Sequence, residues 1–440
     1  MEITFISPYV NGKINPIPSL GIGYLLSSLR TKGHSYRYID GQISSKEFFW
    51  KEVNKIETPI VGLSSFLCDI NELINVAKHI AKRYPDKIII VGGRGPCSLP
   101  PEYLFKKAPI DYIVLGEGEE SLPLLLNYLE SEKLKLEDIS GLAYKKDETI
   151  TITGPFRYIE NLDSLPFPDR ETIRQKEYLK IQEDIVGKPM IRLITSRGCY
   201  HRCTFCANNS TKYRLRTSAN IVEEINSLVD IYKIKNFFFC DAIFMSPKSR
   251  LKELCNQIIN QDLKLNWKAH ARVDEIDFET LKLISEAGCN QLFFGVESGS
   301  DKILKILKKG TTQEQTIEAF ELCKKIGIST FAYFLVGVPG ETDEDIKATV
   351  DIINRIQPDG LDVYILLPYP GSSIFNEYCK DKSFFNWDKY LGWKEDNFEK
   401  SQRKFLNYGA QLNPVKIRKN LLKEYKCLQK NKNFFLRTYK

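Results

Sequence analysis

Three cysteines gather in one short segment and could do chemistry together. Cys199, Cys203 and Cys206 form a C-x3-C-x2-C pattern in TSRGCYHRCTFCANN, whereas the other eight of the 11 cysteines are scattered. Three thiolates on one loop can hold three irons of a cubane cluster, which leaves the fourth iron open to substrate. The alternative is structural zinc, which normally takes four closed ligands. His201 lies inside the loop, where a fourth ligand is sterically awkward, so the spacing favours an iron–sulfur site.

The composition indicates a cytoplasmic enzyme of two or three domains. The chain has 440 residues, 42% hydrophobic and 27% charged, which excludes a mainly disordered protein. An odd number of cysteines argues against a fully paired disulfide framework. The N-terminal sequence MEITFISPYVNGK lacks a basic stretch before an apolar one, so we expect no signal peptide. No apolar run reaches the roughly 18–20 residues of a membrane span.

The net charge of +7 is concentrated at the C-terminus. The last thirty residues carry nine Lys or Arg and one Glu, so the remaining chain is close to neutral. A basic tail could bind RNA, an anionic membrane surface or an acidic redox partner. Charge runs on helices more often mark a solvated face, which is the interpretation we favour. Nucleic acid is therefore not an expected partner.

Residues 1–135 alternate short apolar runs with amphipathic stretches. Continuous apolar strands that alternate with helices indicate a parallel sheet covered on both faces, here a flavodoxin-like, Rossmann-type doubly wound sheet. The expected strands are 3–8, 36–40, 59–65, 87–93 and 111–119. Ligands of such sheets lie beyond the carboxyl ends of the strands. The residues at those ends are Ser64, Ser65, Gly92, Gly93, Gly116, Glu117 and Gly118.

The rest of the chain predicts a connector, a barrel and a cap. Residues 136–187 are polar and proline-punctuated, as in a connector. Residues 188–375 contain six strand–helix units, which predicts an incomplete (β/α)6 TIM-type barrel with chemistry at the carboxyl ends of its strands. The expected strands are 190–198, 235–244, 266–273, 290–299, 330–341 and 362–371. Residues 376–440 predict a small α-rich C-terminal cap that ends in the basic tail.

The cysteine segment and its barrel resemble the radical S-adenosylmethionine (radical SAM) superfamily. Short matches to the family follow the other barrel strands: FFFCDAIF at 237–244, ARVD at 271–274, FGVESGS at 294–300 and GVPGET at 337–342. The resemblance implies a 4Fe–4S cluster on the three cysteines and S-adenosylmethionine on its open iron. It further implies S-adenosylmethionine contacts from Phe205, Asp241, Arg272, Glu297, Ser298, Gly337 and Gly340. Ala242 departs from the family, which usually has a second Asp there.

In that resemblance each residue has a role. Phe205 would lie against the adenine, and Asp241 would face the methionyl amino group. Arg272 would meet the methionine carboxylate, whereas Glu297 and Ser298 would contact the ribose. The turn with Gly337 and Gly340 would let the backbone approach the adenine. One electron from the cluster would then cleave the cofactor to methionine and a 5′-deoxyadenosyl radical.

The N-terminal sheet resembles the cobalamin-binding domain fused to one branch of that superfamily. The segments that carry the resemblance are PSLGIGYLLSSLRTKGH, VGLSS, IIIVGGRGP and DYIVLGEGEESLPLLL. It implies that Ser64, Ser65 and the glycines of the strand ends line the cobalamin groove. Neither His34 nor His79 belongs to the D-x-H-x-x-G motif that supplies His to cobalt in other cobalamin proteins. A bound cobalt would therefore lack a lower His ligand, a state that favours methyl transfer to a carbon radical.

Two functions remain open. The first is methyl transfer from methylcobalamin to an unactivated carbon of a small-molecule substrate, with a flavodoxin- or ferredoxin-type electron donor. The second is a rearrangement, ring contraction or cyclisation without methylation, with a structural or vestigial cobalamin domain. A non-catalytic electron carrier or RNA-binding protein would not cleave S-adenosylmethionine. A tRNA methylthiotransferase is disfavoured, because its N-terminal domain brings three further cluster cysteines and only Cys68 and Cys97 occur here.

Overall fold

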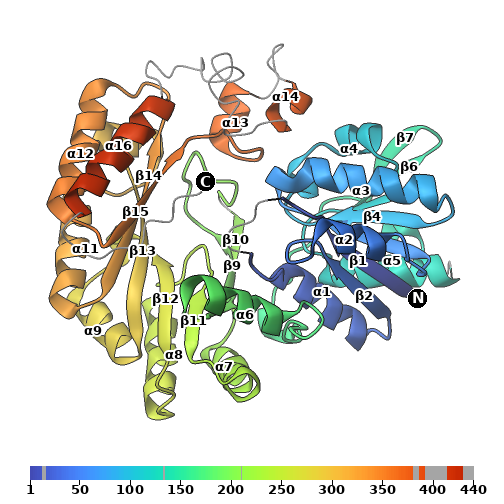
Figure 1. The fold of residues 1–440 in the computed structure, drawn as a ribbon, viewed down its shortest axis with the longest axis horizontal. Coiled ribbons are helices and arrows are strands. Elements are labelled where there is room, and N and C mark those ends of the chain that lie inside the picture. Colours follow the sequence, from blue (N-terminus) through green and yellow to red (C-terminus); the bar gives the residue numbers. More distant parts are fainter. Residues whose placement is uncertain (12–15, 132–133, 210, 380–385, 392–413, 430–440) are drawn as a thin grey trace. The chain divides into compact units, whose positions relative to one another are not determined.

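The computed structural model divides the chain into two compact units, Met1–Pro189 and Met190–Lys440 (Figure 1). It describes residues 1–11, 16–131, 134–209, 211–379, 386–391 and 414–429. Most of the expected cap lies outside the described residues, which retain α14 (Trp387–Leu391) and α16 (Pro414–Gln429) of that region. Among the described helices, none combines the length and the apolarity needed to cross a bilayer.

The first unit is a seven-stranded sheet in the order β2-β1-β3-β4-β5-β6-β7. Its strands are β1 (Glu2–Ser7), β2 (Ser35–Asp40), β3 (Ile60–Ser64), β4 (Ile88–Gly92), β5 (Tyr112–Val114), β6 (Leu142–Lys146) and β7 (Thr149–Ile152). The strands from β1 to β5 are parallel, with helices between them, which confirms the doubly wound sheet. The direction of the strand order changes at β1, so the ends of β1 and β3 flank the usual ligand crevice.

The central strands β3 and β4 are almost wholly buried, because helices cover both faces of this sheet. These helices are α1 (Leu20–Thr31), α2 (Lys46–Val53), α3 (Ile70–Arg83), α4 (Pro101–Lys107) and α5 (Gly118–Ser131). A further helix, α6 (Gln175–Val186), follows β7 along the chain. In α3 the buried residues recur at helical spacing, as Ile70, Leu73, Ile74, Ala77 and Ile80 show. This periodicity is what fixes the helix against the sheet.

The segment expected to be a connector also contributes to the sheet. β6 and β7 form an antiparallel hairpin that extends the sheet beyond β5. Asp147 and Glu148 make its two-residue turn with φ of 46° and 66°, as hairpin turns that match the strand twist require. A buried Tyr178 on α6 donates from its hydroxyl to Asp40 at 2.7 Å and ties the same segment to β2. Residues 136–187 thus pack within the first unit.

The second unit is built on a six-stranded parallel sheet in the order β15-β14-β13-β12-β11-β8. Its strands are β8 (Ile191–Leu193), β11 (Asn236–Phe239), β12 (Asn266–Ala271), β13 (Cys289–Glu297), β14 (Ser329–Val336) and β15 (Gly360–Ile365). Six parallel strands with helical crossovers confirm the partial barrel expected from the sequence. A separate hairpin of β9 (Ser196–Cys199) and β10 (Thr211–Leu215) follows β8.

Helices cover one face of this curved sheet (Figure 1). The helices labelled on that face are α7 (Ser218–Tyr232), α8 (Lys248–Asn260), α9 (Phe278–Glu286), α11 (Gln313–Ile326) and α12 (Asp343–Ile356). Two short helices, α10 (Asp301–Ile306) and α13 (Ser373–Tyr378), follow the carboxyl ends of β13 and β15. Residues alternate strictly along β14, where every second side chain is buried. Phe294 of β13 meets Phe320 of α11 with ring centroids 5.0 Å apart, so this set of alternate residues faces the helices.

Candidate active site

The cysteine loop lies between β9 and β10, and neighbouring elements hold its backbone. The Cys199 N–H donates to Thr211 Oγ1 at 2.9 Å. In the middle of the loop, the Thr204 N–H donates to the Leu307 carbonyl at 2.9 Å, and the Thr204 carbonyl accepts from the Ile374 N–H at 3.0 Å. Residues at the end of α10 and the start of α13 therefore position the loop between Cys203 and Cys206.

The three thiols share one electrostatic environment. Burial raises the pKa of Cys199, and the nearby Cys206 and Cys203 raise it further, whereas Arg272 lowers it. Arg272 Nη1 lies 4.0 Å from Cys203 Sγ and supplies positive charge beside these thiols. In the described part of the chain, no group of three or more His, Cys, Asp or Glu side chains is placed to hold a metal ion. A cubane instead spreads three thiolates over three irons, and this donor set fits it.

Asp241 follows β11 and clamps the turn that leads into the cysteine loop. Its buried carboxylate accepts from the Thr195 N–H at 2.7 Å and the Thr195 hydroxyl at 2.8 Å. It also accepts from the Ser196 N–H at 2.5 Å and the Ser196 hydroxyl at 3.0 Å. These four bonds use the acceptor sites of an ionised carboxylate. The geometry gives Asp241 a positioning role, and its contact with the methionyl amino group stays a prediction.

Arg250 of α8 completes this clamp. Its Nη1 donates to Thr195 Oγ1 at 3.0 Å, and its Nη2 donates to the Phe244 carbonyl at 3.2 Å. Burial raises the pKa of Asp241, while the donors from Thr195 and the charge of Arg250 oppose that rise. Thr195, Ser196 and Arg250 were not among the residues expected from the sequence. The only sequence signal was the pair of hydroxyl residues, Thr195 and Ser196, that opens the segment TSRGCYHRCTFCANN.

Arg272 and Glu297 lie at the carboxyl ends of β12 and β13, each in an ion pair. Arg272 donates to both carboxylate oxygens of Asp274 at 2.9 and 2.8 Å, and also to the Lys309 carbonyl at 2.7 Å. Lys309 Nζ donates to Glu297 Oε1 at 2.8 Å. All but Asp274 are buried. Lys309, which was not predicted, thus links the two residues expected to contact S-adenosylmethionine.

The backbone at Glu297 is in a conformation that non-glycine residues rarely adopt. Its φ is 67°, and the pairing of β13 with β14 shifts register between Gly295 and Glu297. Such bulges turn a side chain away from the regular alternation, and they are frequent next to active sites. A Cβ on Gly295 would stand 2.4 Å from Glu297 Oε1 and 2.8 Å from Lys309 Nζ. The ion pair therefore lies directly over the glycine, in space that a side chain would fill.

The other predicted S-adenosylmethionine residues lie at the ends of β13 and β14. Ser298 Oγ is 3.3 Å from Thr349 Oγ1 and accepts from the Ser300 N–H at 3.1 Å, so it already bonds within the protein. Gly337 and Gly340 have φ of 84° and 79°, which L side chains rarely adopt. A ribose contact from Ser298 and an adenine contact from the two glycines stay predictions.

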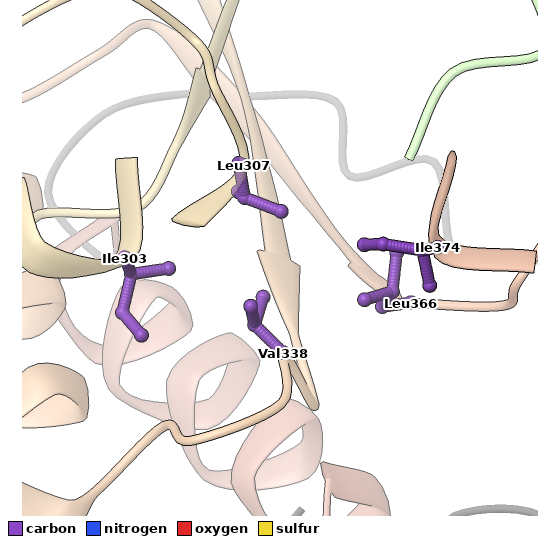
Figure 2. Close-up of a cluster of buried hydrophobic side chains, with 5 residues drawn as sticks. All are labelled: Ile303, Leu307, Val338, Leu366 and Ile374. Carbon is purple, nitrogen blue, oxygen red and sulfur yellow. The ribbon is translucent and has the colours of Figure 1, made fainter. Parts of the chain in front are cut away.

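Phe205 of the cysteine loop packs against a buried apolar cluster. Figure 2 shows the side chains of that cluster. Side chains from α10, the ends of β14 and β15, and α13 form the cluster: Ile303, Leu307, Val338, Leu366 and Ile374. Leu307 also accepts the Thr204 hydrogen bond. Apolar packing and hydrogen bonding therefore fix the loop together, next to the turn that follows β14.

The barrel face that points away from the helices is aromatic. Phe238, His270, Phe293 and Tyr333 come from four successive strands, with ring centroids between 5.1 and 6.2 Å apart in the contacting pairs. Burial lowers the pKa of His270 to about 4, so this imidazole is neutral at pH 7. These half-buried rings line the interior of the barrel with aromatic surface.

In the first unit, the ends of β3 and β4 fit together closely. A Cβ on Gly93, where φ is 87°, would stand 2.4 Å from Ser64 Oγ. Gly92 ends β4, and its Cβ position lies 3.3 Å from the Val114 carbonyl. Ser65 Oγ is buried and has no hydrogen-bond partner, and the Ser65 carbonyl accepts from the Gly95 N–H at 2.9 Å. A buried hydroxyl without a partner at this edge of the sheet fits a polar cofactor such as cobalamin. The roles of Ser64, Ser65, Gly92 and Gly93 in binding cobalamin stay predictions.

At the end of β5, by contrast, the protein fills the space itself. A Cβ on Gly116 would stand 2.3 Å from the Phe156 ring, and Glu117 Oε2 accepts from the Ile159 N–H at 2.9 Å. Gly118 begins α5, and Leu25 of α1 lies 3.0 Å from its Cβ position. Gly116 and Gly118 therefore leave room for the side chains of Phe156 and Leu25, which occupy this space. A cobalamin contact from these three residues stays a prediction.

Neither histidine of the first unit ends a parallel strand. His34 precedes β2, and its Nε2 is buried without a partner. His79 lies in α3, 2.7 Å from Asn54 Oδ1 and with its ring centroid 4.7 Å from that of Trp50. Burial lowers the pKa of both imidazoles. Neither His34 nor His79 therefore lies at the carboxyl edge of the sheet, where a bound ligand is expected.

Comparisons with known proteins agree with both halves of the chain. Residues 193–353 match the radical SAM superfamily, and residues 14–126 match the B12 binding domain. A protein of Pyrococcus horikoshii named "Uncharacterized methyltransferase PH0819" is 31% identical over 404 residues, which cover 89% of this chain and 86% of that protein. The chain belongs to the cobalamin-dependent branch of the radical SAM superfamily. Its cofactors are accordingly a 4Fe–4S cluster, S-adenosylmethionine and cobalamin, as the sequence predicted.

Further relatives differ in the reaction that their names describe. The anaerobic magnesium-protoporphyrin IX monomethyl ester cyclase of Rubrivivax gelatinosus is 27% identical over 412 residues, 89% of this chain and 72% of that protein. Among solved structures, the radical SAM methyltransferase TsrM of Kitasatospora setae superposes with a TM-score of 0.72. It is 21% identical, and the match covers 86% of this chain and 78% of that one. The likeness to TsrM shows the shared fold.

Proposed function

We propose that this cobalamin-dependent radical SAM enzyme transfers a methyl group to an unactivated carbon of a small-molecule substrate. The absence of an axial imidazole in the first unit carries the proposal, because the described positions of His34 and His79 are away from the carboxyl edge of the sheet. Cobalamin bound to the first unit would supply the methyl group, and neither His34 nor His79 would hold its cobalt. The Pyrococcus relative named a methyltransferase supports the same reaction.

The chain's own residues would serve binding and protection. Arg272, Glu297 and Lys309 bring buried charge to the strand ends next to Cys203. The aromatic barrel face keeps water from a reactive radical. When bound, the cofactors would supply the 5′-deoxyadenosyl radical and the methyl group. A flavodoxin- or ferredoxin-type protein would deliver the electron.

The experiment needs no knowledge of the substrate. The anaerobically reconstituted protein, loaded with cobalamin, is given a reductant and S-adenosylmethionine labelled on its methyl group. The methyl-transfer function predicts labelled methylcobalamin together with S-adenosylhomocysteine, both measured by mass spectrometry. Formation of 5′-deoxyadenosine without S-adenosylhomocysteine would contradict it.

That second outcome would favour a non-methylating rearrangement, ring contraction or cyclisation. The identity with the Rubrivivax cyclase over 89% of this chain keeps this alternative open. In this case the cobalamin domain would have a structural role. The three cysteines would still be needed, because the cleavage of S-adenosylmethionine is common to both functions.

A further inference from the structure

Two stretches of the chain that meet at the cysteine loop are basic and contain no acidic residue. Residues 185–222, which include the loop, carry seven Lys or Arg and no Asp or Glu. Residues 302–313, which run through α10, carry four Lys and again no acid. The two stretches are held together because Thr204 donates to the carbonyls of Ile306 and Leu307. Positive charge therefore gathers beside the three cysteines.

Three of these cations reach solvent without a counter-charge. Arg202, Lys305 and Lys308 are exposed, and in the part of the chain that the structure describes no carboxylate forms an ion pair with them. The exposed carboxylates of Asp274 and Asp301 bond elsewhere, to a buried arginine and to a backbone N–H. The charge of the three cations is therefore available to a partner in solution.

Apolar side chains lie among these cations, next to thiols that are only half-buried. Tyr200 is 47% exposed and Ile306 is 37% exposed. The Tyr200 ring is fixed, since its hydroxyl donates to Ser246 Oγ at 3.1 Å. Cys199 and Cys206 are intermediate in exposure. A cluster on these cysteines would lie close beneath the surface, where an electron can reach it from outside.

We propose that Arg202, Lys305 and Lys308, together with Tyr200 and Ile306, form the docking surface for an acidic flavodoxin that reduces the cluster. The inference rests on the proposed function, in which each cleavage of S-adenosylmethionine consumes one electron. Charge complementarity favours an acidic partner. The two apolar residues favour a flavin, because its dimethylbenzene edge is planar and apolar. One electron would leave the reduced flavin and enter the oxidised cluster, which passes from the 2+ to the 1+ state.

A surface of this kind gives fast and weak association. Electrostatic steering raises association rate constants by about ten- to a thousandfold, and salt screens it. Electron-transfer complexes belong to the smallest class of protein interface, so a few cations around an apolar centre are sufficient. The signature of the docking surface is therefore a rate that falls steeply as the salt concentration rises.

The test measures how fast a flavodoxin, reduced in advance, bleaches the absorbance of the oxidised cluster in the reconstituted protein by stopped flow. The variant carries Lys305→Glu and Lys308→Glu together. At low salt its second-order rate constant should fall by about ten- to a hundredfold, because steering is lost. Added KCl should slow the wild type and leave the variant almost unchanged.

Two controls separate docking from damage to the protein. Lys282→Glu with Lys324→Glu makes the same change of charge at exposed residues of α9 and α11. This control should keep the wild-type rate within about twofold, because its charges lie outside the docking surface. Dithionite is a small reductant that needs no docking surface, so it should reduce all three proteins to the same extent.

A Lys305 and Lys308 variant that flavodoxin reduces as fast as the control would overturn the inference, as would a wild-type rate that salt does not change. If the variant fails to fold, the salt dependence of the wild type decides. Reduction of the wild type by an acidic ferredoxin and not by flavodoxin would overturn the choice of a flavin protein. A dithionite-reduced protein that leaves S-adenosylmethionine intact would instead contradict the proposed function, so the two failures are distinguishable.

Discussion

The cysteine loop is fixed by hydrogen bonds, whereas the edge of the N-terminal sheet is shaped by glycines. Thr195 and Ser196 donate four bonds to Asp241 just before the loop. At the sheet edge, Gly93 instead lies against Ser64 so closely that no Cβ fits. Covalent ligands need atoms at fixed positions, whereas a bulky cofactor needs the backbone to be approachable. Different substitutions should therefore damage the two regions.

The largest effect is expected at the three cysteines that we predict to hold the cluster. Replacing Cys199, Cys203 and Cys206 together by Ala should abolish both the visible iron–sulfur absorbance and all 5′-deoxyadenosine formation, because thiolates hold the cluster. Absorption spectroscopy and product analysis measure the two losses. Cys255 of α8 and Cys323 of α11 are buried and unpaired, so their replacement by Ala should preserve both signals. Cleavage by the triple variant would contradict the cluster assignment.

Bulk at the sheet edge should abolish cobalamin binding alone. In Gly93→Trp, the side chain would collide with Ser64 and obstruct the approach of the corrin. Cobalamin binding, followed by absorbance, should be lost, while S-adenosylmethionine is still cleaved without methylation. Gly21→Ala in α1 is the control, because nothing lies within 4 Å of its Cβ position. Loss of the cluster in Gly93→Trp would break the proposed division between the regions.

A variant of Asp241 tests whether this residue positions the cysteine loop or contacts S-adenosylmethionine directly. Asp241→Asn keeps the shape but replaces acceptor capacity by a donor beside Thr195, Ser196 and Arg250. Because it leaves Arg250 without its charge partner, the free energy of unfolding should fall by about 3 kcal/mol. Iron content after reconstitution should fall with it. Unchanged stability and iron content, with weaker S-adenosylmethionine binding only, would establish the direct contact instead.

A smaller loss is expected at Glu297. Glu297→Ala removes the partner of Lys309 and the charge-assisted contact that we predict to the ribose hydroxyls. Affinity for S-adenosylmethionine should fall by about ten- to a hundredfold, or roughly 1.5–3 kcal/mol. Equilibrium dialysis of both cofactors measures this, and cobalamin binding should not change. A selective loss of cobalamin would refute the placement of Glu297 in the S-adenosylmethionine site.

The last effect depends on pH and leaves both binding regions intact. Burial raises the pKa of Glu275 to about 7 from 4.5, with Asp274 adding to the rise. The folded apoprotein therefore keeps a proton that the unfolded chain releases, and its free energy of unfolding falls as pH rises from 4.5 to 7, by up to about 3 kcal/mol. Denaturant unfolding at both pH values should show a smaller fall in Glu275→Gln than in the exposed control Glu279→Gln. Equal falls would contradict the raised pKa.

The local pattern of the sequence predicted the strands, the cysteine loop and the residues at the strand ends. It could not predict which of these residues form hydrogen bonds within the protein through their polar side chains. Asp241 meets Thr195 because β11 pairs with β8, a register that no local pattern specifies. The same holds for Phe156, which reaches Gly116 only through the path of the segment after β7.

The two backbone bonds of Thr204 also bear on how the protein is made. Leu307 and Ile374, which hold this residue, follow it far along the chain. At ordinary rates of synthesis, the cysteines emerge from the ribosome on the order of ten seconds before Ile374. During that interval the thiols lack the neighbours that shape their loop. We therefore expect the loop to take the geometry that holds a cluster only after the last barrel strand has been translated, and its thiols to be open to oxidation until then.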